Sequence, residues 1–341
     1  AKRFRLSRSS RGGMMTGKRI RFGLIGLGRH GSRYARHLLD DLPEAELVAV
    51  CRQDTRAGQE FAEAKDIAFY ADYRELLSDE RLDAVAVVVP PDLNAEICAA
   101  AVRRGLSFVV EKPLAHTLTD AQRILKEAQG GNVKGLVAQT LRFDSVVQTL
   151  KSHLPVLGAL HSILIEQHFE PSPLAWLDEA ERGGIILHTG VHGFDLLRFL
   201  TGAEVVQVYC KSYARFTRKT EDGFSAILEM KPGPLQAVVT NLRTTLGRIG
   251  RIEVIGEYGI LAGDHIHHSL HRIQGRETHP LPLPPPVPTV LACLKSFVTW
   301  LTDNIPPPVS LGDGLRALAA VDACRRSAAT GVSVAIDERS P

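Results

Sequence analysis

The sequence lacks several features that would assign it to a specialised class of protein. Its five cysteines are an odd number and form no CxxC pair, so neither a disulfide framework nor a cysteine-ligated metal site is indicated. No apolar run approaches the ~18 residues of a membrane span, and no internal repeat is present. These absences predict a globular protein of a reducing, cytoplasmic compartment that has no membrane partner.

An excess of charge is also missing from the body of the chain. The net charge is +3, but residues 1–13 carry five basic residues and no acid, so the remainder has a net charge of −2. Such a body has no electrostatic footprint for nucleic acid. We expect residues 1–17 to be a disordered basic leader, and a transit or docking segment is the alternative. A secretory signal is not indicated, because the segment lacks the apolar run that such a signal needs.

The order of apolar patterns predicts two domains within the 341 residues. Residues 18–139 alternate short apolar runs with amphipathic helical patterns, which predicts a Rossmann domain with a doubly wound parallel sheet. Residues 140–310 contain strand patterns that follow one another, which predicts an α+β domain with a mostly antiparallel sheet. Residues 311–341 are expected to be a final helix and tail that pack back on the body.

A glycine-rich motif lies at the end of the first predicted strand. It has the form GxGxxG and consists of Gly26, Leu27, Gly28, Arg29, His30 and Gly31. It follows an apolar strand and opens a helix, which is the context in which the motif binds the pyrophosphate of a dinucleotide. Free N–H groups at the helix start meet the negative charge. The sequence therefore predicts NAD or NADP as cofactor.

The end of the second predicted strand bears on the choice between these cofactors. An acid at this position binds the ribose 2′-hydroxyl of NAD, whereas an arginine suits the 2′-phosphate of NADP. Arg52 stands there with Gln53 beside it, and the first acid is Asp54. The pattern favours NADP, and NAD remains the alternative if the strand ends later and Asp54 reaches the ribose.

Chemistry-bearing residues occur in two further segments. Glu111, Lys112 and Pro113 follow the fifth strand, at the sheet edge where open α/β sheets bind ligands. His188, His192 and Asp195 have a spacing that places them on one face of a helix. A metal on the two histidines is the weaker reading, and the histidines between His265 and His271 are interpreted as a solvated cluster.

Together these motifs resemble the glucose–fructose oxidoreductase / inositol dehydrogenase / rhizopine-catabolism (Gfo/Idh/MocA) family from about Ile20 to Val334. The resemblance rests on the GxGxxG, the Pro90-Pro91 turn followed by Asn94, the EKP triplet, Arg142-Phe143 and the GG…GxHxxD helix. It implies an open-faced second sheet through which homodimers or homotetramers form, and a Lys112–Pro113 bond that is often cis.

The resemblance also implies roles for individual residues. Lys112 binds the reacting hydroxyl and the nicotinamide ribose, His192 is the general acid/base, and Asp195 orients its helix near the substrate. Pro90 and Asn94 border the nicotinamide side of the cofactor, beside Glu111. His168 and Trp176 are expected as walls of the substrate pocket because they flank the segment that leads to the double glycine; a plain core position is the alternative for Trp176.

This chain departs from the family pattern at His188, where an aspartate is usual. The change leaves open whether His188 or His192 transfers the proton. A cleft with Lys112 and two histidines but no carboxylate at this position is more electropositive than is usual, which favours an anionic substrate; a neutral His188 that donates to a sugar hydroxyl is the alternative.

The function predicted is hydride transfer between nicotinamide and a sugar, cyclitol or sugar acid. Two alternatives keep the same fold. One is a non-catalytic regulator that binds the dinucleotide as a signal, against which the intact Lys112 and His192 argue. The other is an enzyme that uses NAD transiently to cleave a glycoside.

Overall fold

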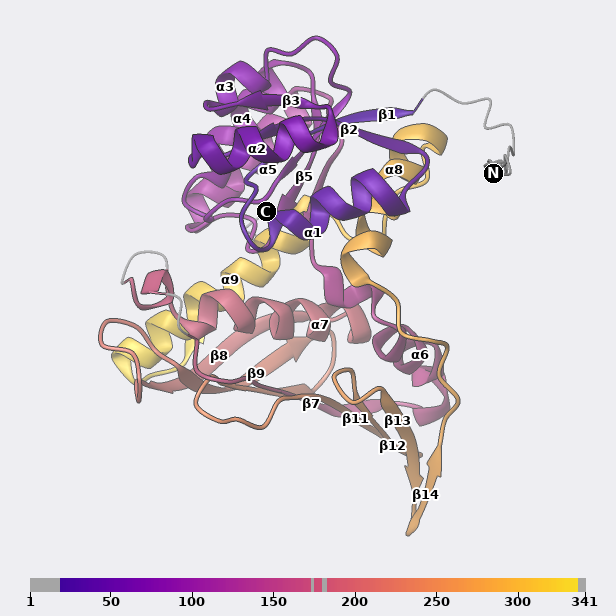
Figure 1. Ribbon diagram of the computed structural model, residues 1–341. Helices are drawn as coiled ribbons and strands as arrows, with labels where there is room; N and C mark the ends of the chain where they lie inside the picture. Colours follow the sequence, from indigo (N-terminus) through magenta and orange to yellow (C-terminus); the bar gives the residue numbers. More distant parts are fainter. Residues whose placement is uncertain (1–18, 173–174, 180–182, 337–341) are drawn as a thin grey trace, which may run out of the picture.

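The computed structural model describes residues 19–172, 175–179 and 183–336, so the expected leader lies outside the described residues. Figure 1 shows one domain above the other, with the last helix of the chain running between them. No helix in the described part of the chain is long and apolar enough to cross a membrane.

The first domain is built on a six-stranded sheet whose strands are all parallel to their neighbours, in the order β3-β2-β1-β4-β5-β6. Every residue of the central strand β4 is buried, as expected of a sheet with helices on both faces. The order reverses between β1 and β4, and ligands bind such sheets at this reversal, beyond the carboxyl ends of the strands. The strands are β1 (Ile20–Ile25), β2 (Ala45–Cys51), β3 (Ala68–Tyr70), β4 (Ala84–Val87), β5 (Ser107–Glu111) and β6 (Gly135–Ala138).

Local sequence determines where the helices of this domain begin. Asp54 accepts a hydrogen bond from Ala57 N at the start of α2, and Thr117 accepts one from Asp120 N at the start of α5. The helices are α1 (Gly31–Arg36, which continues as the π turn His37–Asp41), α2 (Thr55–Lys65), α3 (Tyr73–Leu76), α4 (Asn94–Arg103) and α5 (Leu118–Gly130). The predicted Rossmann alternation is confirmed.

The second domain contains a nine-stranded sheet in the order β14-β13-β12-β11-β7-β10-β9-β8-β15. All pairs are antiparallel except β7 with β10, so the expected mostly antiparallel sheet is confirmed. The strands are β7 (Leu160–His168), β8 (Glu204–Tyr213), β9 (Gly223–Lys231), β10 (Leu235–Leu242), β11 (Ile249–Gly256), β12 (Gly259–Asp264), β13 (Ser269–Gln274), β14 (Glu277–Pro280) and β15 (Val334–Ala335).

Helices cover one face of this sheet and leave the other open. Figure 1 shows α7 lying across the strands on the side of the first domain. Along β9, buried residues alternate with exposed ones, and Ile227 on the uncovered face is 55% exposed. The remaining helical segments are η2 (Thr140–Phe143), α6 (Ser145–His153), η3 (Leu154–Leu157), η4 (Ala175–Asp178), the π turn η5 (Ile186–Gly190), α7 (Val191–Thr201), α8 (Thr289–Asp303) and α9 (Leu311–Thr330).

The two last helices return to the first domain. Helix α8 packs against α1, β6 and η2, with the ring of Phe297 6.1 Å from that of Phe22. The expected bounds place α8 in the second domain, whereas its apolar side is buried on the Rossmann domain and on η2. Helix α9 is the expected final helix, and it contacts α5 and β6 on one side and α7 and β8 on the other.

Candidate active site

The GxGxxG loop has the shape of a dinucleotide cradle. Gly26 has a φ of +98°, and a Cβ there would lie 2.0 Å from Val88 O, so the tight turn requires glycine. A Cβ on Gly31 would lie 1.9 Å from Gly26 O, whereas one on Gly28 would meet no atom within 4 Å. Gly28 therefore leaves its backbone open to a pyrophosphate. Within the loop, Leu27 is buried and Arg29 is exposed.

A buried carboxylate connects this loop with the end of β5. Glu111 Oε1 lies 2.7 Å from His30 Nε2 and accepts a hydrogen bond from the Tyr34 hydroxyl at 2.6 Å. Its Oε2 accepts from Lys112 N at 3.0 Å. Burial favours the neutral acid, but His30, Lys112 and Tyr34 together hold the pKa of Glu111 below its usual value. The side chain of Glu111 thus ties the cofactor loop to the end of β5, and a direct contact between Glu111 and the cofactor stays a prediction.

Asn94 supports the turn after β5 from inside the first domain. Its Nδ2 donates to the carbonyl oxygens of Glu111, Pro113 and Leu114 at 3.4, 3.1 and 3.2 Å. Asn94 is only 1% exposed, so it supports the turn from within the domain, and the role expected for it beside the nicotinamide stays a prediction. The Lys112–Pro113 bond is cis. Pro90, four residues before Asn94, is exposed.

Arg52 follows β2 directly, as the sequence predicted. Its side chain is 34% exposed, and its Nη2 lies 3.5 Å from Asp54 Oδ2. The other oxygen of Asp54 accepts from Ala57 N at 3.2 Å, so this carboxylate is committed to the start of α2. Gln53 is exposed beside them.

Lys112 meets the second domain at the turn that carries His188. Lys112 Nζ donates to His188 O at 2.9 Å, and the His188 ring packs edge-on against Trp176, with centroids 4.7 Å apart. Residues 186–190 form a π turn ahead of α7, not the regular α-helix that the i, i+4 spacing suggested. Such π turns are frequent at functional sites.

His192 lies on the first turn of α7, with its Nδ1 buried and without a hydrogen-bond partner in the described chain. Burial and then the charges of Lys112, His265 and His30 lower its pKa well below the usual value. His192 is therefore a neutral imidazole near neutral pH, which is the form that accepts a proton.

Asp195 lies farther along α7 and is bound to an arginine. Arg142 Nη2 and Nε donate to its two carboxylate oxygens at 2.6 and 2.8 Å, and Asp195 is 1% exposed. Asp195 thus holds α7 on the side away from the cleft, and the expectation that it lies near the substrate stays a prediction. Asp313 continues the network, 3.1 Å from Arg142 Nη2 and 2.8 Å from Arg198 Nη1. Although burial opposes it, these arginines and Ser310 bring the pKa of Asp313 to about 2.

The strand ends beneath α7 contribute polar residues that the sequence analysis missed. Gln167 on β7 and Asn241 on β10 are buried with their side chains on the α7 side of the sheet. His265 is half-buried against Gly250 and acts on the pKa of His192, so it does not belong to a solvated cluster. His168 alternates with Gln167 along β7 and therefore faces the open side of the sheet, away from His192. Burial, opposed by the charge of Glu166 and reinforced by that of Arg251, lowers the pKa of His168.

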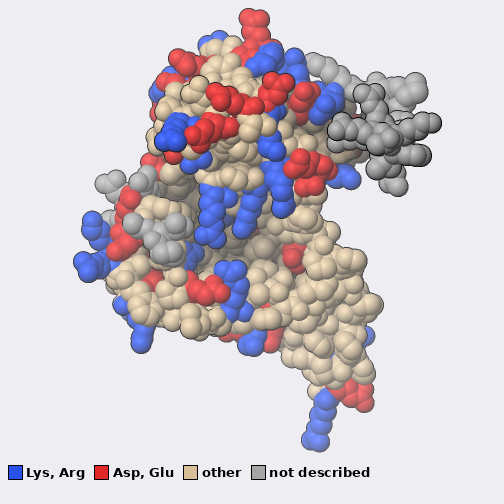
Figure 2. All heavy atoms as spheres, viewed as in Figure 1, with Lys and Arg blue, Asp and Glu red and all other residues tan. Residues whose placement is uncertain are grey.

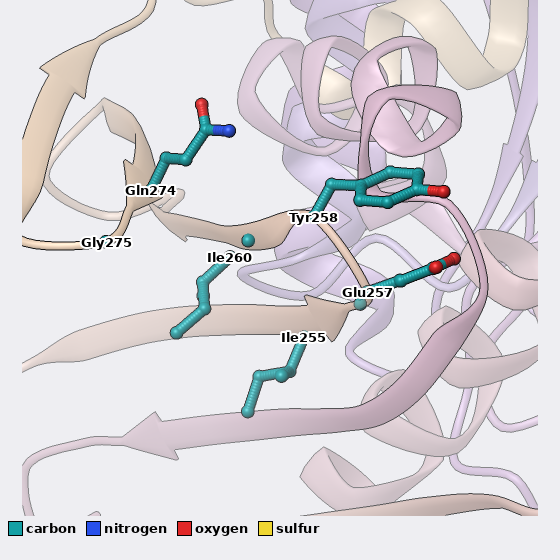
Figure 3. Close-up of a pocket in the computed structure, with 8 residues that line it drawn as sticks. Ile255, Glu257, Tyr258, Ile260, Gln274 and Gly275 are labelled. Atoms are coloured by element: carbon teal, nitrogen blue, oxygen red, sulfur yellow. The ribbon is translucent and has the colours of Figure 1, made fainter.

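The molecular surface agrees with this location of the site. Figure 2 shows Lys and Arg side chains along the border of a hollow between the two domains. Another hollow lies at the far end of the second sheet, between the β11–β12 turn and the end of β13 (Figure 3). Residue 256 there pairs with Leu160 at the start of β7, whereas the candidate site adjoins the other end of that strand.

The first domain has a parallel sheet with a dinucleotide cradle, and Lys112 at the end of one of its strands contacts the π turn of the second domain at His188 O. These features define an NAD-binding oxidoreductase of two domains. The chain belongs to the Gfo/Idh/MocA family. The family model described as an oxidoreductase family with an NAD-binding Rossmann fold matches residues 20–139, and that of the GFO/IDH/MocA C-terminal domain matches residues 156–262.

Individual relatives span most or nearly all of the chain. Myo-inositol 2-dehydrogenase of Thermotoga maritima is 28% identical over 94% of this chain and 99% of its own length. The scyllo-inositol 2-dehydrogenase (NAD(+)) of Bacillus subtilis is 26% identical over 73% of this chain and 75% of its own. The crystal structure of myo-inositol 2-dehydrogenase from Lactobacillus plantarum shares the fold, with a TM-score of 0.82, 24% identity, and coverage of 94% of this chain and 100% of that one.

Proposed function

We propose that this protein is an NAD(P)-dependent dehydrogenase that acts on a CH–OH group of a cyclitol, sugar or sugar acid. The observation that carries the proposal is the contact between Lys112 Nζ and His188 O. This contact brings a cation from the end of a Rossmann strand to the turn that precedes the neutral imidazole of His192. The names of the inositol dehydrogenase relatives support the same substrate class.

The residues of the cleft divide the chemistry between them. When bound in the cradle, the nicotinamide accepts or supplies the hydride. His192, neutral because its pKa is lowered, takes the hydroxyl proton during oxidation and returns it during reduction. Lys112 donates a hydrogen bond to the reacting oxygen and stabilises the negative charge that develops there. Burial, opposed by the charge of Glu111 and reinforced by that of Arg243, lowers the pKa of Lys112.

We propose NADP as the preferred cofactor. Arg52 stands where an NAD enzyme usually presents an acid, and Asp54 is already engaged as the cap of α2. The name of the scyllo-inositol relative specifies NAD. The proposed preference for NADP is therefore based on Arg52 and its surroundings in this chain, not on the relatives.

The proposal extends to assembly and location. The uncovered face of the second sheet exposes Ile227, which suits a homodimer or homotetramer formed through this sheet. All five cysteines are buried and free, which suits a reducing cytoplasm. Light scattering on the purified protein tests the assembly.

A panel of polyols, sugars and sugar acids, assayed by absorbance of reduced nicotinamide, tests the activity. A net change in reduced nicotinamide is the expected result. Product without a net change would indicate transient use of NAD to cleave a glycoside, and cofactor binding with neither would indicate a sensor.

A further inference from the structure

Arg243 is a charged residue of the cleft whose part in the proposed chemistry is confined to its charge, which adds to burial in lowering the pKa of Lys112. It follows β10 directly, and its backbone N–H donates to Asp222 O at 2.8 Å. Its side chain turns to the π turn, where Nη2 donates to Thr189 Oγ1 at 3.3 Å. Lys112 reaches the neighbouring carbonyl of His188. The π turn is thus contacted by two cations that come from different domains.

Neither cation is paired with a carboxylate among the residues that the structure describes. Three acids of the segments around the π turn and the end of β10 have other partners. Asp222 accepts the N–H groups of residues 215–217, Glu221 accepts Ile186 N at 3.0 Å, and Glu170 pairs with Arg248 at 3.0 Å. Burial and the charge of Arg248 lower the pKa of Arg243, yet a guanidinium stays protonated. Arg243 therefore carries a charge that the described protein does not neutralise.

A half-buried arginine without an acid is suited to bind an anion. Its hydrogen bond to Thr189 uses one of five N–H donors. The donors that remain can hold a carboxylate in the bidentate manner that guanidinium groups favour. Because Lys112 is needed at the reacting oxygen, Arg243 alone is left for the charge of the substrate. One guanidinium matches one singly charged carboxylate.

We propose that Arg243 binds the carboxylate of a hydroxy acid derived from a sugar or cyclitol, while Lys112 and His192 act on its hydroxyl group. This inference rests on the proposed dehydrogenase function and narrows its substrate class. It also changes the origin of the anion preference. A preference that depended on protonated His188 would fade as the pH rises, whereas one that depends on Arg243 persists from pH 6 to pH 9.

The test compares matched acid and neutral substrates, such as a uronic acid and its parent sugar, on the unmutated enzyme and on Arg243→Gln. We expect kcat/KM for the acid to fall about 10- to 100-fold in the variant, which corresponds to one or two decades at about 1.4 kcal/mol each. The loss should appear in KM, because the carboxylate is bound equally in ground state and transition state. The neutral substrate should change by less than about threefold, and Arg243→Lys should restore part of the preference.

Arg248→Gln is the matched control, since Arg248 is exposed and pairs with Glu170; it should leave both substrates unchanged. Equal losses for acid and neutral substrates in both Arg243 variants would show a structural role and overturn the proposal. So would a neutral substrate that outperforms its acid on the unmutated enzyme, or a gain confined to sugar phosphates.

A binding measurement separates this inference from the dehydrogenase function. The acid is titrated against the protein with bound reduced cofactor, and the change in nicotinamide fluorescence is recorded. Binding that is lost in Arg243→Gln but leads to no turnover would leave the anion site standing and refute the proposed activity. Turnover of neutral substrates with no Arg243-dependent binding of the acid would do the reverse.

Discussion

Each side of the cleft has a buried carboxylate close in sequence to a proposed catalytic residue, but the two carboxylates are bound by different partners. On the cofactor side, Glu111 precedes Lys112 and is held by His30, Tyr34 and a backbone N–H. On the substrate side, Asp195 lies three residues after His192 and is held by the two-pronged guanidinium of Arg142. Glu111 is coupled to a residue of the cofactor loop, whereas Asp195 is coupled only to the framework.

Because of this difference, changes at Glu111 and at Asp195 should affect different properties: cofactor binding in the first case and stability of the fold in the second. The His30 side chain is 44% exposed, so a change at Glu111 should be felt by the cofactor. Arg142 and Asp195 are buried, and a change there should be felt by the whole fold.

The largest effect is expected from Asp195→Ala. Removal of one partner from a buried ion pair costs about 3–5 kcal/mol when the other charge is left uncompensated. Asp313 stays 3.1 Å from Arg142 Nη2 and offsets part of this cost, so we expect a loss of about 2–4 kcal/mol. Urea unfolding followed by tryptophan fluorescence measures this loss. The control is Glu166→Ala, because Glu166 belongs to an exposed pair with Arg251 at 3.9 Å and should cost less than about 1 kcal/mol. Equal losses in both variants would contradict the framework role of Asp195.

Lys112→Ala should lower kcat by at least about 10²-fold, because the reacting oxygen loses its charged hydrogen-bond donor. The Kd for the dinucleotide should change little, since backbone groups hold the pyrophosphate. Lys134→Ala is the control, because Lys134 Nζ also donates to a main-chain oxygen, that of Trp300, at 2.6 Å but from outside the cleft. Normal turnover by the Lys112 variant would remove this residue from the site.

Arg52→Asp should shift the cofactor preference from NADP toward NAD. A charge-assisted hydrogen bond contributes about 1.5–3 kcal/mol, which corresponds to about one to two decades in Kd. Fluorescence titration with both dinucleotides provides the values for the unmutated protein and the variant. Equal affinities, or tighter binding of NAD by the unmutated protein, would refute the assignment of Arg52.

His188→Asp should move the acid limb of the pH–rate profile upward. The lowered pKa of His192 keeps it neutral at pH 6.5 and above, so alcohol oxidation should be lost only as the pH falls further and the base becomes protonated. A carboxylate beside His192 favours the imidazolium and raises this pKa by about one unit or more. Profiles of kcat/KM for oxidation measure the shift. An unchanged acid limb would show that residue 188 does not act on His192.

The smallest effect is expected from His30→Ala, which should weaken dinucleotide binding by up to about tenfold through loss of one hydrogen bond to a carboxylate. The coupling is tested with Glu111→Gln and the double variant. Because the two side chains are in contact, the double variant should lose less than the sum of the single losses. Simple additivity would show that Glu111 does not act through His30.

The features that the sequence predicted well are local ones. Strand and helix periodicity, the glycine spacing of the cradle and the start of α9 depend on residues close together in the chain. The place of Lys112 at the edge of the cleft could be inferred because ligands bind beyond the strand ends of a parallel sheet.

The features that the sequence did not reveal depend on contacts between distant segments. Arg142 and Asp195 are 53 positions apart, and Arg243 reaches Thr189 across 54. Arg243 lies in a loop with no recognisable motif around it. His265 acts on His192 because the pairing of β11 with β12 brings it to this end of the sheet. The apolar pattern of α8 predicts a helix but not the domain on which it packs.

Asp313 serves two purposes that cannot be changed independently. One oxygen accepts hydrogen bonds from Ser310 N and Oγ, both at 2.8 Å, and the other accepts from Arg198. The side chain of Asp313 therefore both caps the first turn of α9 and binds the arginines that hold α7 in place. A deletion or insertion between residues 303 and 310 that moved the start of α9 by a single residue would withdraw Asp313 from both arginines. The length of this short connection is thus as tightly constrained as the residues of the active site themselves.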